Sequence, residues 1–177
     1  MMRNRLIRSF IIMVIAYLID GLIVYLLPYP FTRQGAIIVP SLSLICFTML
    51  VNDFDDSTER YFFSAICGLY YSIVYSNALA AYVLIYIIIA FVRTKFFSTN
   101  RFGFMQFAVF AMSIVAFKEV FIYVLEFIVR ATSFAFYLFI LQRLLPTMLI
   151  NGILSLLVYA IYPKLGISKE GNTYLER

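Results

Sequence analysis

YFFSAICGLYYSIVYSNALAAYVLIYIIIAFV, residues 61–92, contains no charged side chain. At a rise of about 1.5 Å per residue, one helix of this length would be roughly 48 Å long, whereas the hydrocarbon core of a bilayer is about 30 Å thick. Because Ser76 and Asn77 form the only polar pair near the middle of the run, the sequence predicts two helices, residues 61–75 and 78–92, joined by a tight turn. The alternative is one tilted span plus a re-entrant segment that neighbouring helices cover.

The composition of the whole chain agrees with a membrane solvent. Hydrophobic residues make up 64% of the chain and charged residues only 13%, whereas globular chains are about a quarter charged. The net charge of +5 does not indicate nucleic acid, because the basic residues flank hydrophobic segments and form no basic stripe with exposed aromatic residues. We therefore expect no nucleic-acid partner.

Apolar runs on either side of residues 61–92 predict four further spans. The first follows a basic N-terminus but has no small-residue cleavage site, which indicates a retained helix rather than a signal peptide. Proline residues mark three boundaries, since Pro28 and Pro163 follow spans and Pro40 fits the first turns of one. The predicted spans are residues 6–27, 35–51, 61–75, 78–92, 102–128 and 136–162. The predicted fold class is therefore all-α, a single-domain polytopic membrane protein with six short transmembrane helices.

Lysine and arginine residues are distributed unequally between the two sides of these spans. Only Arg33 and Arg130 fall on one side. The other side carries Arg3, Arg5, Arg8, Arg60, Arg93, Lys95, Arg101, Lys164, Lys169 and Arg177. Because cytoplasmic loops hold the excess of basic residues, the sequence predicts that both termini are cytoplasmic.

Four ionisable residues fall inside predicted spans, where a charge is costly unless it finds a partner. They are Asp20, Lys118, Glu119 and Arg143, and we expect all four at one depth in the outer half of the bilayer. The interpretation is a neutral cluster in which Asp20 pairs with one base and Glu119 with the other. The cluster then either fixes the packing of the helices or lines a polar cavity or partner surface. Ion transport is disfavoured because a relay needs groups through the full depth.

Polar residues outside this cluster predict little chemistry. The acidic stretch of residues 52–60 lacks the glycine and the distal glutamate of a calcium loop, and we interpret it as a solvated loop or a docking patch for a basic partner. Glu126 and Arg130, four residues apart, are expected to interact locally. The chain has no histidine, and Cys46 and Cys67 lie in apolar runs. We expect no cofactor and no metal site.

Two segments carry packing signals. Gly68, with a serine four residues to either side, forms a face that lets another helix approach closely. In residues 143–151, RLLPTMLIN, Pro146 frees the carbonyl of Gln142, which Thr147 or a neighbouring helix can satisfy. Asn151 is expected to form a hydrogen bond across helices.

The stretch from Arg143 through Pro146 and Thr147 to Asn151 resembles the last helix of the bacterial rod shape-determining MreD family. Ile38-Val39-Pro40 and residues 68–76, GLYYSIVYS, agree with the same order of elements. One position departs from the family, because many relatives carry an acidic residue where this chain has Ser72. A role of that acid cannot be transferred to this chain.

The resemblance implies a non-enzymatic membrane subunit of the cell-elongation (rod) complex in the bacterial plasma membrane. It implies MreC as a partner and, through MreC, the RodA glycosyltransferase and a class B penicillin-binding protein. It also implies a fold similar to the substrate-binding subunits of energy-coupling-factor transporters, and it leaves open a homodimer and a bound membrane lipid. The alternative function is a vitamin-type binding subunit of such a transporter. An enzyme is disfavoured because no nucleophile and base are paired at a membrane face.

Overall fold

The computed structural model describes residues 2–26, 37–54, 56–75, 79–96 and 103–162. Within these ranges the chain is helical or irregular, and no residue is in a strand. The predicted turn at Ser76 and Asn77, the loop after Pro28 and the polar C-terminal tail all lie outside the described residues.

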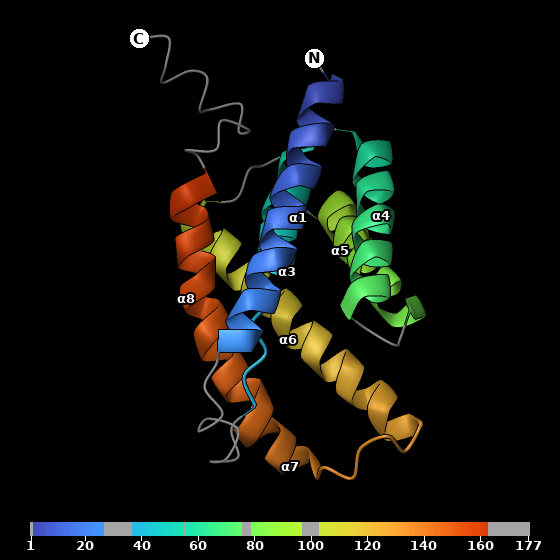
Figure 1. The fold of residues 1–177 in the computed structure, drawn as a ribbon, viewed down its shortest axis with the longest axis vertical. Coiled ribbons are helices and arrows are strands. Elements are labelled where there is room, and N and C mark those ends of the chain that lie inside the picture. The colour runs from blue at the N-terminus through green and yellow to red at the C-terminus, as the bar shows by residue number, and fades with distance from the viewer. Residues whose placement is uncertain (1, 27–36, 55, 76–78, 97–102, 163–177) are drawn as a thin grey trace.

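Six helical stretches follow one another within the described residues (Figure 1). The first five are α1 (Met2–Leu26), α3 (Leu42–Asp53), α4 (Ser57–Tyr75), α5 (Leu79–Phe96) and α6 (Phe104–Ile128). The sixth is continuous but changes its winding, from α7 (Phe136–Leu138) through the π-helical η1 (Phe139–Leu144) to α8 (Leu145–Ile161). Residues 61–92 are thus divided between two helices.

Successive helices run in opposite directions, so that the start of α1 and the end of α8 lie at the same end of the bundle (Figure 1). The shortest of the main helices, α3, lies in the middle and packs against α1, α4, α5, α6 and α8. Nine of its twelve residues are buried. A helix that is apolar all round and buried on most sides is what a central position requires.

The second predicted span is only partly helical. Residues 37–41 form no helix, with Ser41 at φ −137° and ψ 44°, and the helix begins at Leu42, which corrects the expectation of Pro40 in the first turns of a helix. Proline fixes φ near −65°, a value compatible with both an early helical turn and an extended chain. The neighbouring side chains of α8 decide between the two, as described below.

Aromatic side chains fill the space between α3 and the antiparallel pair α4 and α5. Phe47 of α3 stacks on Phe63 of α4, with 5.9 Å between ring centroids, and lies 4.5 Å from the ring of Tyr86 of α5. All three side chains are at most 1% exposed. This aromatic cluster joins the central helix to the α4–α5 pair.

Three helices of the described part are long and apolar enough to cross a bilayer. They are Leu6–Leu26, Phe104–Ile128 and Phe136–Ile161. Large apolar side chains on these helices are exposed, among them Leu18, Met105 and Leu149. In water such surfaces would be costly, and in a bilayer they face a solvent as apolar as themselves.

Helix α6 ends before the second member of the predicted Glu126 and Arg130 pair. Arg130 has φ of 55° and lies just beyond the helix. The N–H of Arg130 donates to the backbone carbonyl of Phe127 (3.1 Å), and the N–H of Ala131 donates to the backbone carbonyl of Glu126 (2.8 Å). Such bonds satisfy the last carbonyls of a helix. Glu126 finds its charged neighbour elsewhere, on η1.

Candidate functional site

The structure brings the four ionisable residues together where the extended residues 37–41 meet the N-terminus of α3. We call Asp20, Lys118, Glu119 and Arg143 the charged cluster and residues 37–41 the extended segment. They come from α1, α6 and η1, so three helices separated widely in sequence converge on an irregular segment of the core. Non-helical backbone is tolerated at membrane depth only where protein covers it.

Glu119 is the centre of the charged cluster. Its side chain is fully buried, with Oε1 2.6 Å from Lys118 Nζ and Oε2 accepting a hydrogen bond of 2.8 Å from Arg143 Nε. One carboxylate therefore serves two cations. A buried ion pair repays its desolvation only when its geometry is good and its remaining donors are satisfied.

The two cations use their other donors to reach in opposite directions. Lys118 Nζ donates to Ser41 Oγ at 2.8 Å, which ties α6 to the end of the extended segment. Arg143 Nη1 lies 3.7 Å from the carboxylate of Glu126, which is 39% exposed. Because Glu119 and Glu126 are seven residues apart, they lie on one face of α6, and Arg143 bridges them.

Among the described residues Asp20 forms no ion pair with a base, which differs from the expectation of two ion pairs. Its two carboxylate oxygens accept hydrogen bonds of 2.8 Å from the backbone N–H groups of Leu42 and Ser43. These donors belong to the first turn of α3, where a helix leaves its N–H groups without internal partners. The positive end of the helix dipole also favours a carboxylate there.

Side chains of α8 hold the extended segment through its alternate residues. Thr147 Oγ1 accepts from Val39 N (3.1 Å) and donates to Ile37 O (3.4 Å). Asn151 Nδ2 donates to Val39 O (2.9 Å), and its Oδ1 accepts from Ser41 N (2.8 Å). One face of an extended chain offers an N–H and a carbonyl at every second residue, and a hydroxyl or an amide can serve as donor and acceptor at once.

Pro146 completes this arrangement. It cannot donate to the carbonyl of Gln142, and Ile37 N donates to that carbonyl instead, at 2.6 Å. The extended segment thus supplies a partner for this carbonyl. Gln142 and Arg143 lie in η1, and a π-helical turn of this kind is often found at functional or strained positions.

Gly68 lies in a close contact between α4 and α5. A Cβ at this position would be 2.9 Å from the Cα of Val83, a backbone atom that cannot move aside alone. Tyr17 of α1 closes the same region, because its hydroxyl donates to the carbonyl of Cys67 at 3.0 Å. Gly68 therefore allows close packing of α4 and α5 and is not part of the charged cluster.

Sequence reasoning missed a second polar group at the opposite end of α3. Arg60 Nε donates to the carbonyl of Phe54 at 2.9 Å, and Arg93 Nε donates to Asn52 Oδ1 at 2.6 Å. Both arginines are buried, and Phe54 is 1% exposed, whereas Asp56, Ser57 and Thr58 are exposed. The stretch of residues 52–60 is therefore solvated only in part. The dipole of a helix favours cations beside its C-terminus. This rule could have identified the two arginines only if the end of α3 had been known.

The chemistry available to the charged cluster is limited by its own contacts. Lys118 and Arg143 both bind Glu119, and Asp20 binds backbone N–H groups. In the part of the chain that the structure describes, no three histidine, cysteine or acidic residues are grouped as metal ligands would be. The arrangement stabilises an irregular backbone segment rather than presenting reactive groups.

Comparisons with known proteins agree with the motif at Pro146, Thr147 and Asn151. No curated protein and no solved structure matches the chain, so the expected likeness to energy-coupling-factor subunits has no support from known structures. A family model, that of the rod shape-determining protein MreD, matches residues 4–166. The chain belongs to the MreD family of rod shape-determining membrane proteins.

Proposed function

We propose that the chain is a non-enzymatic subunit of the bacterial cell-elongation (rod) complex that binds MreC and supports peptidoglycan synthesis and cell shape. The observation that carries the proposal is the family match over nearly the whole chain. The internal pairing of the charged cluster supports it, because a subunit that assembles partners needs a fixed helical surface and no reactive side chain.

All six helical stretches cross the bilayer in this proposal, although only three meet the length and hydropathy of a full span alone. The extended segment adds the length that α3 lacks for a full span. Five non-helical residues at up to about 3.3 Å each and twelve helical residues at about 1.5 Å each cover at most roughly 34 Å, enough for the ~30 Å hydrocarbon core. A break in the helix thus lets a short stretch reach across the membrane.

Both termini face the cytoplasm of the bacterial cell in this proposal. The placement of lysine and arginine supports it, as does the position of the start of α1 and the end of α8 at one end of the bundle (Figure 1). Fusion of a reporter that is active only in the cytoplasm should give signal at either terminus. Activity at only one terminus would contradict an even number of spans.

Binding to MreC would use the exposed apolar helix faces. Association of helices in lipid relies on packing and a few hydrogen bonds, because lipid tails are as apolar as the side chains. RodA and a class B penicillin-binding protein would join through MreC. A homodimer is a further arrangement that the same faces would permit.

The vitamin-binding alternative is not favoured by the charged cluster. The cavity beside Lys118, lined by Ser41, Ser43 and tyrosine side chains, has a volume of only about 10 Å³. That is room for about one water molecule. Charges that would recognise a vitamin are occupied by one another instead.

Affinity purification of the tagged protein from its native membrane in mild detergent tests the proposal. We expect MreC and the synthesis enzymes to co-purify. Recovery of a pair of ATPases with a transmembrane coupling subunit, without MreC, would contradict the proposal and identify a transporter subunit. A tagged membrane protein of similar size and unrelated function serves as the control for proteins that are carried along in detergent.

A further inference from the structure

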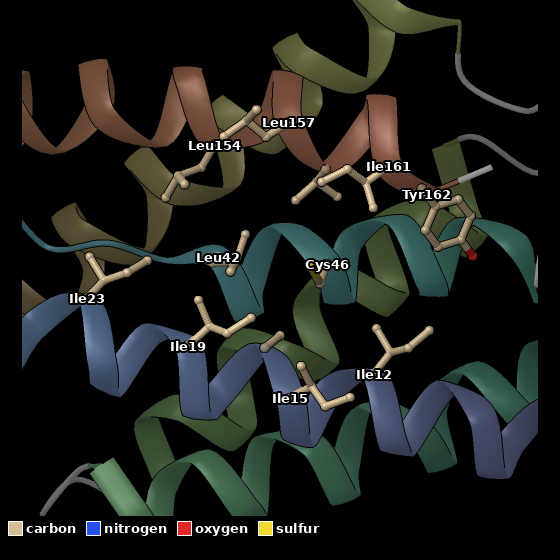
Figure 2. Close-up of a pocket in the computed structure, with 12 residues that line it drawn as sticks. Ile12, Ile15, Ile19, Ile23, Leu42, Cys46, Leu154, Leu157, Ile161 and Tyr162 are labelled. Carbon is tan, nitrogen blue, oxygen red and sulfur yellow. The ribbon is translucent and has the colours of Figure 1, made fainter. Parts of the chain in front are cut away.

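A groove runs between α1 and α8, with α3 as its floor (Figure 2). Its volume is about 390 Å³. The lining comes from Ile12, Ile15, Ala16, Ile19 and Ile23 of α1, from Leu42 and Cys46 of α3, and from Leu154, Leu157, Val158, Ile161 and Tyr162. Figure 2 shows the side chains of α1 and α8 facing each other across α3.

The lining excludes a polar occupant. Carbon atoms provide nearly all of it, and the Tyr162 hydroxyl is already used, since it donates to Asp53 Oδ2 at 2.8 Å. A water-soluble ligand would lose its hydrogen bonds to water here and gain none in return. The occupant is therefore a hydrocarbon group.

The side chains of the groove favour an acyl chain over a partner helix. Helices that pack in membranes meet through glycine, alanine, serine and threonine, which let backbones approach closely. Here Ala16 is the one such residue among twelve. Cys46 is also small, and the remaining ten are bulky and mostly branched. A narrow flexible chain can follow a surface of this kind, whereas a helix about 10 Å wide packs closely only against small residues.

The length and the charged end of the groove match a phospholipid. From Ile12 to Ile23 α1 rises by roughly 16 Å, which is about half of the ~30 Å hydrocarbon core and therefore the depth of one leaflet. Arg8 lies four residues before Ile12 on the same helix face. It is exposed and has no ion-pair partner among the described residues.

We propose that the groove binds one anionic phospholipid, with an acyl chain between α1 and α8 and the phosphate group at Arg8. The proposal needs only that the protein resides in a membrane, and it stands whether or not MreC is the partner. The bound chain covers α3 where α1 and α8 do not, and it makes the lipid part of the folded subunit.

Native mass spectrometry tests the proposal on the whole protein, after reconstitution in bilayers of phosphatidylglycerol and phosphatidylcholine. We expect one retained lipid per chain, with phosphatidylglycerol preferred by about fivefold, the effect of one arginine beside an anionic headgroup. Arg8→Gln should remove the preference and keep the bound lipid. Equal retention of the two lipids by the unaltered protein would overturn the proposal.

Two pairs of variants test the place of the acyl chain. Leu157→Trp and Ile15→Trp fill the groove from α8 and from α1, and both residues are about half exposed, so that neither substitution disturbs the core. Their controls, Ile153→Trp and Leu18→Trp, lie on the same helices outside the groove. We expect lipid retention to fall only in the groove variants. If those variants keep the lipid but lose a second copy of the chain or a protein partner, the groove is a protein interface and the proposal is wrong.

Discussion

Glu119 holds Lys118 and Arg143 with a single carboxylate, so the stability of the charged cluster depends on this residue. Glu119→Gln would remove the counter-charge that Lys118 and Arg143 share, and Lys118 is only 4% exposed. Breaking a buried pair in this way costs on the order of 3–5 kcal/mol. We expect a large fall in the melting temperature of the purified protein in detergent.

Glu126→Gln is the matched control for that substitution. It removes a carboxylate from the same helix face that also lies near Arg143, but at 3.7 Å and 39% exposed. Such pairs contribute about 0–1 kcal/mol. If the two variants melted at the same temperature, the carboxylate of Glu119 would not have the central role assigned to it.

Asn151 supports the extended segment, because its amide accepts from Ser41 N and donates to Val39 O. Asn151→Leu leaves the buried N–H of Ser41 and the partly buried carbonyl of Val39 without this partner, which costs about 1–3 kcal/mol. The measurement is the melting temperature, together with hydrogen exchange of the amide of Ser41, which should become faster. Ser155→Ala is the control, since that buried hydroxyl bonds only within its own helix, to Gly152 O. Equal exchange in both variants would show that α8 does not hold the segment.

At the scale of the helices, Gly68 sets the distance between α4 and α5. Gly68→Ala places a methyl group 2.9 Å from the backbone of Val83, and we expect a loss on the order of 1–3 kcal/mol as the helices are forced apart. Gly152→Ala meets only the flexible end of Met112, at 3.6 Å. It should be neutral or slightly stabilising, by up to about 1 kcal/mol, because alanine favours helix over glycine. The free energies of unfolding of the two variants check the contrast, and a neutral Gly68→Ala would contradict the close packing.

Hydropathy and the residues that separate the apolar runs predicted the helices well. Both signals, including the polar pair at Ser76 and Asn77, depend only on local composition. The helices on both sides of that polar pair are Ser57–Tyr75 and Leu79–Phe96. They cover nearly the same residues as the two predicted spans, 61–75 and 78–92. The extended segment could not be predicted, because Pro40 fits either conformation and the partners of its neighbours lie on α8, more than a hundred residues away.

The same limit applies to the partners of the charges. Sequence reasoning matched acids with bases, but Asp20 binds N–H groups that become available only once α3 is known to begin at Leu42. The buried Arg60 was hidden in the same way, because its acceptor is a backbone carbonyl near the end of α3. The backbone groups that bind these charges lie at helix ends. The position of a helix end depends on contacts with residues far away in the sequence, so it is hard to predict from local composition.

For the whole molecule, the structure describes a bundle whose central helix is short and is completed by an extended segment. Side chains of α6 and α8 hold this segment, and Asp20 of α1 holds the first turn of α3 that follows it. In this account the charged cluster maintains the bundle, and the outer helix faces bind the partner. The two roles can be separated, because a substitution in the cluster should change stability without changing the partner surface.

The most direct measurement compares Arg143→Ala with the unaltered protein in two readouts, the melting temperature and the amount of MreC that co-purifies per folded molecule. The account predicts a lower melting temperature, because Glu119 loses a partner at 2.8 Å, and unchanged recovery of MreC from the molecules that remain folded. Loss of MreC at an unchanged melting temperature would contradict the account and place the partner on the charged cluster itself.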